Sequence, residues 1–141
     1  MGDTYDSAAE AAADREQQQA LLTALNGWDR ALRRDDCGAW CIHGEKYHRR
    51  MPYGGSIHTR GDGKTWVLYV RCRSALHWGW TKNKRAFSTV TQDGDDDGCL
   101  RLHQLPTPAQ AEAIRDAVGI RKRRGISETE RERLRAFNLG R

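Results

Sequence analysis

The chain has 141 residues, of which 38% are hydrophobic and 30% carry a charge, and its formal net charge is +5. This length fits one domain with a core and excludes two large ones. No stretch approaches the roughly 20 apolar residues of a membrane span, and the acidic N-terminus lacks an apolar signal-peptide region. We therefore expect a cytoplasmic protein with no membrane partner, whose four cysteines are free thiols or metal ligands rather than disulfides.

The charge is unevenly distributed along the chain. Residues 1–36 hold 4 Lys and Arg against 8 Asp and Glu, residues 37–105 hold 11 against 6, and residues 106–141 hold 9 against 5. These shifts predict an N-terminal helical arm, an α+β core and a basic C-terminal helical arm. The first part of the N-terminal arm is poor enough in apolar residues to be disordered.

The N-terminal arm has the pattern of one long helix. Ser7 and Glu10 have the spacing of a capping box, in which each side chain satisfies an unpaired N–H of the first turn. An apolar stripe with helical spacing follows at Leu21, Leu25, Trp28 and Leu32. We expect a helix over residues 8–34 with only its second half docked, and core packing is favoured over a partner helix as the use of this stripe.

Two strand pairs are predicted in the core, after a short strand around Trp40–His43. The runs 56–60 and 64–72 flank Gly61-Asp62-Gly63, which is a hairpin signature. The alternating runs 88–92 and 99–103 flank an Asp/Gly-rich turn and form the second hairpin.

A helix is predicted between the two hairpins, over residues 74–87. Leu76, Trp78 and Trp80 alternate as they would in a strand, but the segment is too long for a strand without a break, and Ser74 is a suitable N-cap.

The C-terminal arm has the signals of two helices. Thr107-Pro108 is a helix start and Gly119 a helix end. Ser127 and Glu130 repeat the capping-box spacing and predict a second helix through Phe137. The fold class is therefore α+β: a small antiparallel sheet of about four strands in two hairpins, an inserted helix, an N-terminal amphipathic helix and a basic two-helix C-terminal arm.

Two sets of residues resemble metal sites without matching one. Asp93, Asp95, Asp97 and Gly98 match the first half of an EF-hand loop, but Gln104 stands where the loop needs a bidentate Glu. A solvated acidic turn is therefore favoured over a cation site. Zinc-type ligands occur at Cys37, Cys41, His43 and His48. The single residue between the second and third ligands leaves little chain to turn around a metal, so we expect no cofactor, with zinc as a minor alternative.

No catalytic signature is present. The chain lacks a GxSxG elbow, an HExxH pair and a Gly-rich phosphate loop. A Cys/His pair that meets in space stays open, but an enzyme is not the favoured class.

Basic residues carry the strongest functional signal. They form a run at Arg121, Lys122, Arg123 and Arg124, share a face of the last predicted helix at Arg131 and Arg135, and follow Trp78 and Trp80 at Lys82, Lys84 and Arg85. Cations beside aromatic rings suit phosphate contacts together with base stacking, although a salt-bridged solvent face is the ordinary alternative.

The leading hypothesis is a small non-enzymatic accessory protein of phage or mobile-element type that binds DNA or RNA. The second is a protein-interaction module, such as an inhibitor of a nucleoprotein complex, whose acidic turn at Asp93, Asp95, Asp96 and Asp97 mimics phosphate. The third is a metal-dependent enzyme.

Overall fold

A computed structural model describes residues 8–48, 51–59 and 62–124 of the chain. In chain order the elements are α1 (Ala8–Ala24), the 3-10 helix η1 (Asp29–Ala31), β1 (Leu32–Arg34), β2 (Trp40–His43), β3 (Lys46–His48), β4 (Met51–Thr59), β5 (Trp66–Arg71), α2 (Ala75–Lys84), β6 (Thr89–Asp93), β7 (Asp97–Leu102) and α3 (Pro108–Val118). The class is α+β, as the sequence predicts.

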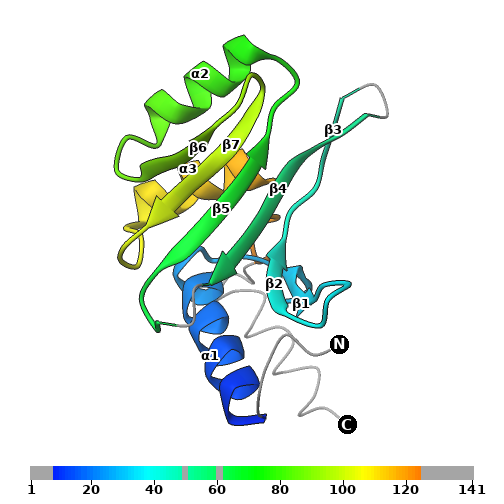
Figure 1. The fold of residues 1–141 in the computed structure, drawn as a ribbon, viewed down its shortest axis with the longest axis vertical. Helices are drawn as coiled ribbons and strands as arrows, with labels where there is room; N and C mark the ends of the chain where they lie inside the picture. Colours follow the sequence, from blue (N-terminus) through cyan, green and yellow to red (C-terminus); the bar gives the residue numbers. More distant parts are fainter. Residues whose placement is uncertain (1–7, 49–50, 60–61, 125–141) are drawn as a thin grey trace, which may run out of the picture.

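One antiparallel sheet organises these elements (Figure 1). Its strand order is β1-β2-β4-β5-β7-β6, and β3 pairs with β4 outside this path. Both predicted hairpins are confirmed, as β4–β5 and β6–β7, and so is the strand Trp40–His43. The expectation of about four strands was too low, because β1 and β3 are three-residue strands whose sequences carry no period-2 pattern to detect.

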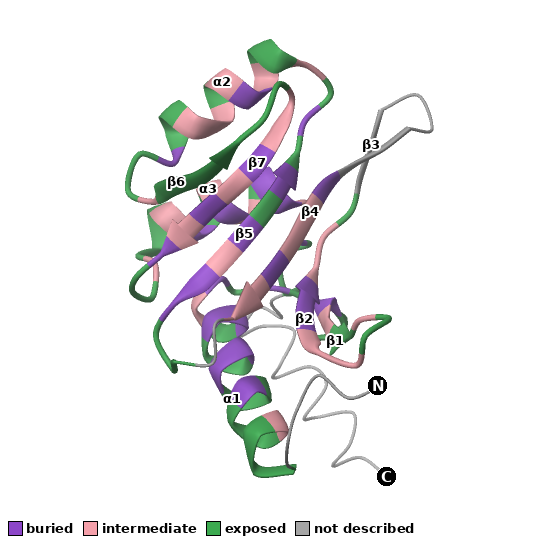
Figure 2. Ribbon diagram, in the orientation of Figure 1, coloured by how far each residue is buried: buried purple, intermediate pink, exposed green. Residues whose placement is uncertain are grey.

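The sheet buries one face. Side chains alternate along β5, where Trp66, Leu68 and Val70 are buried while Tyr69 and Arg71 are exposed (Figure 2). The helix α3 lies behind β5 and β7 in Figure 1, and its residues Ala111, Ile114, Ala117 and Val118 join the same core. The expectation that this helix belongs to a separate arm was wrong. The second helix predicted for the arm lies outside the described residues.

The first helix ends ten residues before the predicted boundary. Asn26 adopts a positive φ of 51°. A side chain at Gly27 would meet Leu22, because a Cβ there would lie 2.6 Å from its Cδ1 atom. The chain therefore turns at these two residues and continues as η1 and β1 rather than as helix.

The helix α1 docks earlier than expected, with Gln17 and Gln18 in the first half of the predicted helix over residues 8–34. It does so with polar side chains: Gln18 Nε2 donates to the carbonyls of Trp40 (3.2 Å) and Ile57 (2.9 Å), and Gln17 Nε2 donates to that of Thr65 (3.1 Å). Hydrogen bonds to backbone carbonyls of the sheet and of the residue before β5 replace the apolar stripe that the sequence lacks here.

The other two helices begin where their caps predict. Ser74 Oγ accepts from the backbone N–H of His77 at the start of α2, and Thr107 forms a capping box with Gln110 at the start of α3. Within the described residues, no helix combines the length and apolar character needed to cross a membrane.

Candidate functional site

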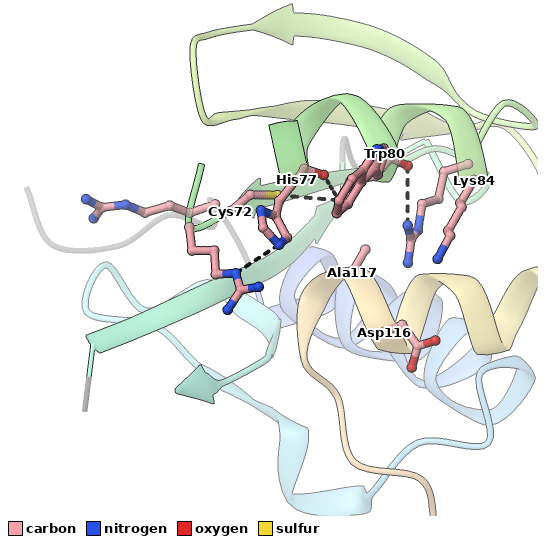
Figure 3. Close-up of a pocket in the computed structure, with 10 residues that line it drawn as sticks. Cys72, His77, Trp80, Lys84, Asp116 and Ala117 are labelled. Atoms are coloured by element: carbon pink, nitrogen blue, oxygen red, sulfur yellow. Dashed lines mark hydrogen bonds between the residues drawn. The ribbon is translucent and has the colours of Figure 1, made fainter. Parts of the chain in front are cut away.

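A cleft of about 440 Å³ opens between α2, the end of β5 and the C-terminal half of α3 (Figure 3). Residues 71–73 form one wall, α2 forms a second, and Asp116 and Ala117 of α3 form the floor. Lys84 points from α2 toward these two α3 residues in Figure 3.

The cleft is cationic. Arg71, Arg73 and Lys84 are exposed, and the buried Arg85 adds a fourth positive charge to the lining. Among the described residues Asp116 is the one acidic residue that lines it, so the formal charge of this lining is +3. Within a concave, partly desolvated site, such an excess raises the local concentration of anions.

One face of α2 supplies the aromatic side chains of the cleft. His77, Trp80, Thr81 and Lys84 follow one another with helical spacing and therefore share this face. The imidazole of His77 meets the indole of Trp80 edge to face, with ring centroids 5.0 Å apart. Trp80 nevertheless keeps 51% of its surface exposed, which leaves the indole accessible to a ligand.

The His77 ring is held from both sides. Arg73 donates its Nε–H to His77 Nε2 over 2.9 Å, so Nε2 is an acceptor and carries no proton in this arrangement. His77 Nδ1 then holds the proton and donates it to Ser74 Oγ. These bonds orient both the imidazole and the Arg73 guanidinium at the rim of the cleft.

Arg85 is not the phosphate contact that the sequence predicts. It is 5% exposed, and its guanidinium donates to the carbonyls of Ala113 (2.8 Å) and Thr81 (3.4 Å). Burial lowers the pKa of Arg85, an effect that the nearby Asp116 opposes. Arg85 therefore links α2 to α3 beneath the cleft. It would act on a ligand through the electrostatic field of its charge and not through a direct contact.

The opposite face of α2 is occupied by an internal contact. Trp78 is 1% exposed and donates from Nε1 to Asp93 Oδ1 over 2.7 Å, while Lys82 forms an ion pair with the same carboxylate at 2.9 Å. The hydrogen bond from Lys82, and to a lesser extent that from Trp78, lowers the pKa of Asp93. Because Trp78 is buried, it cannot stack on a base, and the prediction that it does so was wrong. The charge of Lys82, also predicted to contact phosphate, is already matched by a carboxylate.

Two carboxylates of the acidic turn have intramolecular partners. Asp93 accepts from α2 as described, and Asp97 Oδ2 accepts from the Tyr69 hydroxyl over 2.9 Å, which raises the pKa of Tyr69. Because Asp93 is neutralised by Lys82 and Asp97 is engaged by a hydroxyl, the turn is a weaker phosphate mimic than the sequence indicates. The described residues contain no cluster of three His, Cys, Asp or Glu side chains arranged to hold a metal.

A Cys/His pair does form, but not with an activated thiol. Cys41 Sγ lies 3.7 Å from His58 Nε2, which also lies 2.9 Å from Ser56 Oγ. Burial, and to a lesser extent Asp35, raises the pKa of the Cys41 thiol to about 11. Burial also disfavours the charged form of His43 on the same strand, so it lowers the pKa of that imidazole. The Cys41 thiol stays protonated near neutral pH and is a poor nucleophile or metal ligand. The side chain of His48 lies outside the described residues.

The basic run 121–124 pairs with the turn after α1. Trp28 N–H donates to Arg121 O (2.8 Å) and Arg123 N–H to Asn26 O (2.7 Å), so the two segments pair as an isolated β-bridge. Arg123 also pairs with Asp29 at 2.7 Å. Arg131 and Arg135 lie outside the described residues.

The sequence led to Trp80 and Lys84 but missed Arg71, Arg73 and His77. The helical spacing of α2 already separates Trp78 and Lys82 from Trp80 and Lys84, and this was the signal that could have sorted the residues. No local pattern marks Arg71 or Arg73, which enter the cleft only because the end of β5 lies against α3.

Comparisons of the chain with protein-family models, with curated proteins and with solved structures found no match.

Proposed function

We propose that this protein binds single-stranded nucleic acid in the cleft between α2 and α3. The observation that carries the proposal is the position of an exposed indole, Trp80, beside the exposed cations Arg73 and Lys84. A nucleotide presents an aromatic base and a phosphate a few ångströms apart, and this pair of groups matches it. Stacking on the ring would supply affinity for any base, and the cations would contact phosphates.

The indole favours a single strand over a duplex. Only an unpaired base exposes its face to a protein side chain, whereas a duplex offers its edges and its phosphates. A cleft of about 440 Å³ lies in the size range of small-ligand sites and admits a nucleotide but not a helix of paired strands.

The neighbouring lysines of α2 provide the test. Lys84 lines the cleft, while Lys82 faces away and pairs with Asp93. Fluorescence anisotropy with a labelled single strand, measured as DNA and as RNA over several salt concentrations, would compare Lys84→Ala with Lys82→Ala. We expect Lys84→Ala to weaken binding and to lower the slope of log affinity against log salt by about 1. Lys82→Ala should keep the slope of the unmodified protein.

Truncation of the ring tests the stacking separately. We expect Trp80→Ala to cost roughly 1–3 kcal/mol of binding free energy, or about 5- to 150-fold in affinity, without changing the salt slope. Leu76→Ala is the matched control, because Leu76 is also an exposed apolar residue of α2, at 61%, outside the cleft. Equal affinity for duplex and single strand, or equal effects of the two lysine variants, would refute the proposal.

A further inference from the structure

A second cationic pocket, also of about 440 Å³, lies at the end of α3. Arg30, Arg33 and Arg121 line it together with Trp28. Glu45 is the one acidic residue in the described part of the lining, whose formal charge is therefore +2. All three arginines are exposed. We refer to it as the Trp28 pocket.

The guanidinium groups of this pocket are ordered by the indole of Trp28. Arg121 and Arg30 lie 5.5 Å and 5.7 Å from the ring centroid. A guanidinium that stacks on a ring keeps its N–H edge for a ligand, and its loss of side-chain freedom on binding is smaller. The nearby carboxylate of Asp29 does not compete for these groups, because it pairs with Arg123.

The chemistry of the pocket differs from that of the cleft. Trp28 is 40% exposed, but its indole is contacted by two guanidinium groups, so the pocket offers mainly N–H donors. Paired N–H groups of arginine match the geometry of phosphate oxygens. The ligand that fits is therefore a phosphate group and not a base.

Both sites include a residue at the C-terminal end of α3. Ala117 lines the cleft, and Gly119 lines the Trp28 pocket. Successive Cα atoms are 3.8 Å apart, so these two residues are within about 8 Å of each other. Because residues two apart on a helix do not share a face, a strand that occupies both sites would pass around the C-terminal end of α3.

We propose that the Trp28 pocket is a second phosphate-binding site, which holds the backbone of the same strand that occupies the cleft. The claim that one strand occupies both sites rests on the proposed function. The phosphate site itself does not, because it follows from the arginines and can be probed without nucleic acid.

Inorganic pyrophosphate tests the site alone. In a ¹H–¹⁵N spectrum, the indole signal of Trp28, assigned by Trp28→Phe, should shift on titration with pyrophosphate and should stay in place in Arg121→Ala. Arg34→Ala is the matched control, since Arg34 also stacks on an indole, that of Trp40 at 5.2 Å, outside both sites. A Trp28 signal that does not move with pyrophosphate in the unmodified protein would overturn the phosphate site.

Oligonucleotide length tests the shared strand. Binding of two sites by one strand raises affinity beyond either site alone. We therefore expect the double variant Arg121→Ala and Arg33→Ala to lower the affinity for a strand of about 15 nucleotides roughly tenfold or more. Its affinity for a strand of about 3 nucleotides should be unchanged. Lys84→Ala should weaken both strands.

The results separate the two proposals. If Lys84→Ala weakens binding of both strands while the double arginine variant weakens binding of neither, the proposal of a second site is wrong and the proposed function stands. If only the arginine variant has an effect, nucleic acid does not occupy the cleft, and the shared strand is wrong with it. If neither variant has an effect, both proposals are wrong.

Discussion

Two glycines with ordinary backbone angles, Gly98 and Gly79, differ in the space around them. A Cβ at Gly98 would lie 2.3 Å from the ring of Trp78 and equally close, 2.3 Å, to the carbonyl oxygen of Gln92. Gly98 thus creates the space on β7 into which the buried indole fits. Gly79, in the middle of α2, has nothing within 4 Å of its Cβ position.

Alanine at these two positions should therefore have opposite effects. We expect Gly98→Ala to lower the free energy of unfolding by about 1–3 kcal/mol, because the fixed indole must move. Gly79→Ala should raise it by roughly 0.5–1 kcal/mol, because alanine loses less backbone entropy in a helix. Urea denaturation measures both, as shifts of the midpoint at constant slope. A Gly98→Ala variant as stable as the unmodified protein would mean that Trp78 is not held where the structure places it.

The Cys41 thiol gives a pH-dependent prediction. Its pKa in the folded protein, about 11, is above its ordinary value of 9.0. As pH rises, the unfolded chain loses this proton first, so Cys41 lowers the stability of the fold between about pH 9 and pH 11 and has no effect below that range. Iodoacetamide at pH 8 should accordingly modify the exposed Cys37 quickly and the buried Cys41 only after denaturation. In Cys37→Ser, equally fast modification of Cys41 with and without denaturant would contradict this account.

At the scale of elements, α2 shows how one short helix separates structure from binding. On one face, Trp78 and Lys82 both bond to the carboxylate of Asp93. On the other face, Trp80 and Lys84 line the cleft. The sequence predicts the helix through the Ser74 cap, but the list of basic and aromatic residues does not say which of them the sheet will cover. Only the helical period applied to that list separates the two faces.

Elements defined by local chemistry were predictable, and those defined by distant partners were not. The Thr107-Pro108 start of α3 follows from capping alone. In contrast, Leu32–Arg34 becomes β1 because Trp40–His43 lies opposite it, and nothing within those three residues favours a strand. The end of α1 was misplaced for the same reason: the apolar stripe continues past Gly27, but Gly27 pairs with Lys122, far along the chain, as an isolated β-bridge.

At the scale of the whole molecule, both ends of the described chain are part of a single core. Leu21 and Leu22 of α1 and Ile114 and Val118 of α3 belong to one cluster of buried residues with the strands. The cleft and the Trp28 pocket both depend on this arrangement, because α3 lines the first and the turn after α1 lines the second. Their charged walls therefore come from segments far apart in the sequence.

The docking of α1 can be tested through one buried polar residue. Gln18 has 0% exposure and donates from Nε2 to two strand carbonyls. Gln18→Ala removes both bonds and leaves buried acceptors without this donor, so we expect a loss of about 1–3 kcal/mol in the free energy of unfolding. Gln19→Ala, at the next and exposed position, should change it by less than about 0.5 kcal/mol. Urea denaturation compares them, and equal stability of the two variants would show that α1 is not held to the sheet by its glutamines.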